Sequence, residues 1–184
     1  TKQKIKNQNK RKEKKLAMEA ADTALTAIDL VKDMAHEIGF KRLISFVIVN
    51  DTDEDIKFLE EMTEHGSFCW PGYIGKHSTS QGTAQKKFGS HGLKGAALYQ
   101  WGQSKLCFFF SNPLKGNNKS GIGCFDANEN KSAQSVYLDT PRIECGQELK
   151  QQINSFVTIS SYVSPEKSAK GAFHIKQANT EPQN

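Results

Sequence analysis

The sequence predicts a mainly β protein: a β-sandwich flanked by helices, with an amphipathic N-terminal helix. Two observations support this fold class. Residues 16–38 repeat apolar side chains at three- and four-residue steps, whereas the chain after Gly39 changes to short alternating or continuous apolar runs. Those runs are rich in β-branched and aromatic residues and are separated by polar turns, which is typical of an antiparallel sandwich or barrel.

The 184 residues suit one domain, and their charge is divided unevenly. Residues 1–15 carry eight basic side chains and one acidic side chain, a net charge of +7, while the other 169 residues carry a net charge of −2. We expect this segment to be a disordered basic arm or a leader, because it has almost nothing apolar to bury. Since the remainder is mildly acidic, the composition disfavours a nucleic-acid partner.

Residues 16–39 are predicted to form the amphipathic helix together with its stop at Gly39. The apolar stripe consists of Met18, Ala21, Leu25, Ile28, Val31, Ala35 and Ile38. Acidic side chains lie largely off that stripe, namely Glu19, Asp22, Asp29, Asp33 and Glu37. About 20 helical residues at ~1.5 Å each match the ~30 Å hydrocarbon core of a bilayer. The helix can therefore pack along the sandwich, or several copies can span a membrane with the stripes toward lipid and the acidic faces lining water.

Residues 40–177 are predicted to form the sandwich. The expected strands are Leu43–Val49, Ile56–Met62, Phe68–Ile74, Leu93–Trp101, Lys105–Ser111, Gly121–Phe125, Ser135–Leu138, Ile153–Ser161 and Gly171–Lys176. Polar segments such as His77–Gly82 and Leu114–Ser120 are expected to be turns. Residues Cys145–Gln152 are expected to form a short helix, and residues 178–184 a frayed tail.

No catalytic or metal-binding motif stands out, so we expect no enzyme activity, no cofactor and no metal site. The five histidines are scattered, and no nucleophile elbow or phosphate loop has the required spacing. The cysteines Cys69, Cys107, Cys124 and Cys145 form no CxxC pair, which leaves two disulfides or four free thiols open. No run of 18 apolar residues is present, so no ordinary transmembrane helix is predicted.

Three stretches carry a family resemblance. The first runs from Asp22 to Gly39 and continues through Phe40-Lys41-Arg42 into the strand LISFVIVND. The second joins KGAALYQW (Lys94–Trp101) to LCFFFSNP (Leu106–Pro113), and the third is the closing pair Asn154–Tyr162 and Gly171–Lys176. In this order, over about residues 18–177, they resemble the actinoporins, the pore-forming cytolysins of sea anemones.

The resemblance implies a secreted β-sandwich that binds sphingomyelin-containing membranes, inserts its N-terminal helix and oligomerises into a pore. Residues 16–38 would be the inserting segment, and its acidic face predicts a pore that favours cations. The residues that match the headgroup pocket of the family are Ser67, Ser111, Pro113 and Tyr137.

Two places differ from the family pattern. The loop Leu114–Gly123 has no aromatic residue, and Asp139–Arg142 stands where further tyrosines are expected. Phe68, Trp70 and Tyr73 are candidates for a substitute aromatic patch at the membrane interface, or alternatively for a strand core. These differences leave open a non-lytic module that binds lipid, glycan or protein on the same sandwich.

Overall fold

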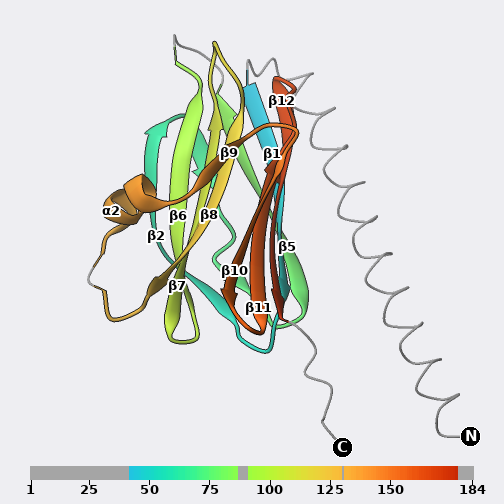
Figure 1. Ribbon diagram of the computed structural model, residues 1–184. Helices are drawn as coiled ribbons and strands as arrows, with labels where there is room; N and C mark the ends of the chain where they lie inside the picture. The colour runs from blue at the N-terminus through green and yellow to red at the C-terminus, as the bar shows by residue number, and fades with distance from the viewer. Residues whose placement is uncertain (1–41, 87–90, 130, 178–184) are drawn as a thin grey trace, which may run out of the picture.

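Two six-stranded sheets packed face to face dominate the part of the chain that the structure describes (Figure 1). The computed structural model describes residues 42–86, 91–129 and 131–177. Its strands and helix are β1 (Arg42–Asp51), β2 (Ile56–His65), β3 (Ser67–Cys69), β4 (Tyr73–Ile74), β5 (Ser78–Lys86), β6 (Leu93–Trp101), β7 (Ser104–Asn112), β8 (Lys119–Asp126), α2 (Ala133–Asp139), β9 (Arg142–Glu144), β10 (Glu148–Asn154), β11 (Val157–Val163) and β12 (Ser168–Gln177).

The first sheet has the strand order β10-β11-β12-β1-β5-β3, and the second has the order β4-β2-β6-β7-β8-β9. The pairings are antiparallel apart from that of β1 with β12, which run parallel with Leu43 opposite Ser168. The predicted β-sandwich is therefore confirmed, with one parallel pair that the sequence did not indicate.

The core lies between the sheets and is made by alternate residues of each strand, because successive side chains of a strand point to opposite faces. On β7, Phe108 and Phe110 face the core, whereas the intervening Phe109 faces outward. The core rings pack closely on Phe173 of β12, with ring centroids 4.7 Å from Phe108 and 4.6 Å from Phe110.

The helix α2 covers part of the outer face of the second sheet, on the side away from the first sheet (Figure 1). Val136 and Tyr137 are buried against outward-facing residues of β6 and β7, including Phe109. Ser132 caps the helix, since its side chain accepts a hydrogen bond from the Ser135 backbone N–H. The prediction of a strand at Ser135–Leu138 is wrong, because this cap and the burial of two successive residues against the sheet favour one short helix.

The prediction of a helix at Cys145–Gln152 is also wrong. Most of that segment belongs to β10, where half-buried Leu149, Gln151 and Ile153 alternate with exposed residues. Residues Ser78–Gly82 form part of β5 where a turn was expected. The strand is polar, and its place in the sheet comes from pairing with β1 on one side and β3 on the other.

Two predicted strands each contain a break. The segment Phe68–Ile74 is divided into β3 and β4, which belong to different sheets, and Pro71 lies between them without a backbone N–H to donate. The segment Ile153–Ser161 spans the turn that joins β10 to β11. The short strand β9 was not predicted at all.

The predicted arm (1–15), amphipathic helix (16–39) and tail (178–184) lie outside the described residues, as do the inserting and pore-lining candidates. Within the described ranges, no helix combines the length and the hydropathy needed to cross a membrane.

Candidate functional site

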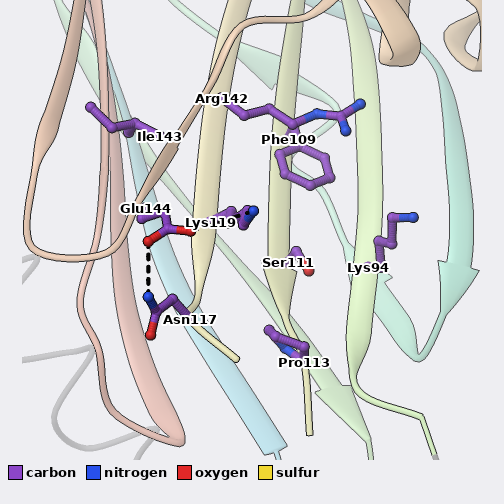
Figure 2. A pocket seen from close by; sticks show the side chains of 9 residues that line it. All are labelled: Lys94, Phe109, Ser111, Pro113, Asn117, Lys119, Arg142, Ile143 and Glu144. Atoms are coloured by element: carbon purple, nitrogen blue, oxygen red, sulfur yellow. Dashed lines mark hydrogen bonds and ion pairs between the residues drawn. The ribbon is translucent and has the colours of Figure 1, made fainter. Parts of the chain in front are cut away.

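A pocket of about 390 Å³ opens on the outer face of the second sheet, beside α2 (Figure 2). It is lined by Lys94, Phe109, Ser111, Pro113, Asn117, Lys119, Arg142, Ile143 and Glu144. Figure 2 shows Ser111 near the middle of this group, with Lys94 to one side and Lys119 to the other. The pocket therefore presents a hydroxyl between two cationic side chains.

Strand register explains this arrangement. Lys94 of β6 lies opposite Ser111 of β7, and Ser111 lies opposite Lys119 of β8, which in turn lies opposite Glu144 of β9. Neighbouring strands are about 4.8 Å apart, so one row across the sheet brings these four side chains together on one face. The row takes its polar residues from segments that are distant in sequence.

The next row on the same face holds Phe109, Gly121 and Arg142 on β7, β8 and β9. Because Gly121 has no side chain, the side chain of Arg142 can extend across β8. Its guanidinium carbon lies 4.6 Å from the centroid of the Phe109 ring and 4.4 Å from that of the Tyr137 ring. One guanidinium nitrogen of Arg142 also donates a hydrogen bond to the Tyr137 carbonyl. Arg142 is therefore held over both rings by cation–π contacts.

Ion pairs fix the charges at the two ends of the lysine row. The Lys94 ammonium lies 2.6 Å from the Glu64 carboxylate. Partial burial lowers the pKa of Lys94, but hydrogen bonds with Glu64 and Tyr137 outweigh that effect, and the pKa is raised overall. At the other end, the Asn117 amide donates a 2.8 Å hydrogen bond to Glu144, and this bond together with the nearby Lys119 lowers the pKa of Glu144. At neutral pH the lining thus carries three cations and one carboxylate.

The structure brings some of the sequence-predicted headgroup candidates together and leaves one apart. Ser111 and Pro113 both line the pocket. Tyr137 adjoins it, since its ring contacts Arg142 and lies 5.4 Å from the Lys94 ammonium. Ser67 is not among the lining residues, because it lies on β3 in the first sheet, opposite Gln85.

Trp70 does not belong to an interfacial patch, which corrects one of the sequence-based interpretations. Only 9% of its surface is exposed, and its ring lies 4.8 Å from that of Phe46 and stacks on that of Phe68 at 5.4 Å. The alternative, a core position, is correct for Trp70. Phe68 is half-buried at the edge of this cluster, and Tyr73 is 55% exposed.

Sequence reasoning missed most of the charged lining. Lys94 begins the stretch KGAALYQW, and strand alternation alone would have placed it on the face opposite the core. Arg142 and Glu144 could not be placed in the same way, because both lie on β9, which the sequence pattern does not predict.

A second hollow of about 360 Å³ lies on the outer face of the first sheet. Its charged lining mixes Lys150 and Lys176 with Glu148, and burial lowers the pKa of His174. In the described residues, no group of three His, Cys, Asp or Glu side chains is arranged to hold a metal ion. The pocket beside α2 is the stronger candidate, because two lysines flank the Ser111 hydroxyl there and Phe109 adds an aromatic side chain to the lining.

The described residues define the class of fold as a two-sheet β-sandwich, here with a cationic pocket on an outer face. Comparison with solved structures matches 23 chains. One of them, the crystal structure of the lipid-binding protein Nakanori, has a TM-score of 0.70 and 16% sequence identity, with 89% of this chain and 85% of that chain covered. At this level of identity the likeness shows a shared fold. Comparison with protein-family profiles and with curated proteins gives no match.

Proposed function

We propose that this protein binds membrane lipid through the pocket beside α2. The observation that carries the proposal is the row in which Ser111 lies between Lys94 and Lys119 on an open face of the second sheet. A hydroxyl flanked by ammonium groups suits the phosphate that lipid headgroups carry. The shared fold with Nakanori, which is described as a lipid-binding protein, supports the same conclusion.

We propose binding and not catalysis at this site. A general base must be able to accept a proton near neutral pH. The raised pKa of Lys94 keeps it protonated, and the hydrogen bond from Asn117 favours the charged form of Glu144, which already lies near Lys119. The lysines can hold an anionic ligand in place, whereas neither Lys94 nor Glu144 is suited to exchange protons with it.

Vesicle co-sedimentation with Ser111→Tyr tests this proposal. The bulky ring fills the pocket at an outward-facing strand position, so binding should fall by about tenfold or more while thermal unfolding changes little. Ser160→Tyr is the matched control, because Ser160 lies on the outer face of the first sheet and lines the other hollow. If wild type binds none of the vesicles in a panel of zwitterionic, sphingomyelin-containing and anionic lipids, the proposal is wrong.

A second candidate function is membrane permeabilisation. The apolar stripe of residues 16–38 favours it, because a helix of that length and amphipathicity suits insertion after the sandwich has bound. In this scheme the protein is secreted, binds membrane lipid, self-associates and forms a pore that favours cations.

Calcein release from liposomes separates permeabilisation from its alternative, a non-lytic module that binds lipid, glycan or protein. Leakage that accompanies binding supports a pore, and binding without leakage on every composition supports the module. A glycan array identifies a sugar ligand if vesicles are not bound. If the protein permeabilises liposomes, reversal potentials should show that the pore prefers cations. A preference for anions contradicts the role of the acidic helix face.

A further inference from the structure

We infer that the pocket beside α2 selects a phosphomonoester headgroup and not a choline-bearing one. The inference rests on the proposed function and names the chemical class of its ligand. The feature behind it is Arg142, whose guanidinium occupies the aromatic surface at the pocket and adds a third cation to the lining (Figure 2).

The aromatic faces at the pocket already have a cationic partner. A quaternary ammonium is recognised by cation–π contact with several ring faces. Here the two rings beside the pocket, Phe109 and Tyr137, are 1% and 5% exposed, and the guanidinium of Arg142 lies over both. A choline group would have to displace Arg142 and would meet the like charges of Lys94 and Lys119.

The lining offers an anion more than one cationic group. Lys94, Lys119 and Arg142 contribute three positive charges, while Glu144 in the lining and Glu64 behind Lys94 contribute two negative charges through their ion pairs with Lys119 and Lys94. A phosphomonoester carries a charge of about −1.5 to −2 at pH 7 and three terminal oxygens, whereas a phosphodiester carries a single charge. Two ammonium groups, a hydroxyl and a guanidinium with further N–H donors match those three oxygens.

The donors lie in two neighbouring rows of the sheet. Lys94 and Lys119 flank Ser111 at one strand spacing on each side, with the Lys94 ammonium turned toward Glu64, and Arg142 lies in the next row. The hydrogen bond from its guanidinium to the Tyr137 carbonyl uses one of five N–H donors. Asn117 holds Glu144 at the edge of the pocket through a hydrogen bond, so the carboxylate has a partner of its own.

The position of the pocket favours a lipid as the source of the phosphate. The lining residue Pro113 is followed directly by Leu114, whose apolar side chain is 39% exposed. An exposed leucine beside a phosphate-binding pocket can enter the interfacial region of a bilayer while the headgroup is held. A soluble phosphate ester would gain nothing from that contact.

Binding to vesicles of matched surface charge tests the inference. Phosphatidylcholine vesicles are doped with phosphatidic acid, a phosphomonoester, or with phosphatidylglycerol, an anionic phosphodiester, to the same zeta potential; a third set contains sphingomyelin. The full-length chain should bind the phosphatidic acid vesicles about tenfold more tightly than the phosphatidylglycerol vesicles, equivalent to about 1.4 kcal/mol. The sphingomyelin vesicles should give the weakest binding.

The double variant Lys94→Gln/Lys119→Gln should bring the ratio between phosphatidic acid and phosphatidylglycerol close to one. Lys150→Gln/Lys176→Gln is the matched control, because it removes the same charge from the outer face of the first sheet and should leave the ratio unchanged. Thermal unfolding of both variants checks that each is folded. A third variant, Arg142→Gln, should also lower the ratio between phosphatidic acid and phosphatidylglycerol binding, since it removes one cation from the pocket.

The possible results separate the inference from the function on which it rests. Equal binding to both anionic vesicles, a preference for sphingomyelin, or a ratio that survives in Lys94→Gln/Lys119→Gln overturns the inference and leaves lipid binding intact. Absence of binding to every vesicle overturns the proposed function. If calorimetry detects inorganic phosphate in the pocket but no vesicle is bound, the ligand chemistry is supported and the lipid source is wrong.

Discussion

Gly121 is the residue on which the geometry of the pocket depends most directly. It lies in the register between Phe109 and Arg142, and a Cβ atom placed on it would lie 2.3 Å from the Pro141 carbonyl oxygen and 3.2 Å from the Arg142 side chain. The first contact is with backbone and cannot be relieved by a rotamer change. The close approach of β9 to β8 therefore requires glycine here.

We predict that Gly121→Ala lowers the free energy of unfolding by about 1–3 kcal/mol, as is typical of overpacking at a buried position. It should also shift β9 and reduce the discrimination between the two anionic vesicles. Gly72→Ala is the control, since a Cβ there meets nothing within 4 Å. Denaturant titration of both variants measures the difference, and equal stabilities contradict this account of Gly121.

The four cysteines are free thiols in the structure, which selects one of the two possibilities left open by their spacing. Cys69 is exposed, whereas Cys107 is buried beneath α2, and burial raises the pKa of Cys107 to about 11. Since only the thiolate attacks, we predict that Cys69 reacts first with a thiol reagent at pH 8 and Cys107 last, on the time scale of unfolding. Peptide mapping after timed alkylation checks the order, and early labelling of Cys107 refutes it.

At the scale of elements, a small charged cluster links the end of β1 to the connection before β5. His77 precedes β5 and has a left-handed backbone with φ of 47°, and its ring nitrogens lie 3.0 Å from Asp53 and 3.3 Å from Asp51. The hydrogen bond with Asp53, followed by that with Asp51, raises the pKa of His77. The protonated form is thus favoured by folding.

We predict that this cluster stabilises the protein at low pH and not at high pH. A raised folded-state pKa gives stabilisation that is complete below the unfolded value of about 6.5 and is lost as pH rises through the folded value. At pH 5.5 the free energy of unfolding of wild type should exceed that of His77→Asn by less than about 1 kcal/mol, because all three groups are exposed. The difference should shrink at pH 9. Asparagine tolerates the same backbone conformation. A difference that grows with pH contradicts the prediction.

The elements that the sequence predicts well are those with a strong local pattern. β1, β6 and β7 have long apolar runs, and each lies in the middle of a sheet, where burial on both faces requires such residues. β5 is missed because its sequence is polar. Its strand conformation is stabilised by pairing with β1 and β3, and the local sequence pattern does not reveal this pairing. The choice between helix and strand at α2 depends likewise on the sheet beneath it.

The candidate site could be predicted only in part, for the same reason. Ser111 and Pro113 belong to a continuous stretch that resembles a known family, so a local comparison reaches them. Lys119 and Arg142 belong to the site because the pairing of β7, β8 and β9 places them next to Ser111 and Phe109. The register depends on where each strand begins, and β9 has too few residues to show any pattern.

At the scale of the whole molecule, charge is concentrated in residues 1–15, which carry a net +7 against −2 for the remainder. We predict that removing this arm weakens binding to both kinds of anionic vesicle by a similar factor, because each basic residue near such a surface contributes about 1 kcal/mol regardless of headgroup. The ratio between phosphatidic acid and phosphatidylglycerol should therefore survive the truncation, and its loss would place the selectivity in the arm. Added salt should weaken binding of the full chain more than that of the truncated chain.

The parallel pairing of β1 with β12 bears on how the chain is made. Leu43 and Ser168 are neighbours in the first sheet although they lie near opposite ends of the described chain. At about 5–20 residues per second, a ribosome delivers β12 on the order of ten seconds after β1. Until then β1 has one open edge of unpaired backbone groups and an apolar face, the features that template aggregation. The nascent protein therefore has a period of exposure that ends only when β12 has been synthesised, and a chaperone that covers β1 would act in that interval.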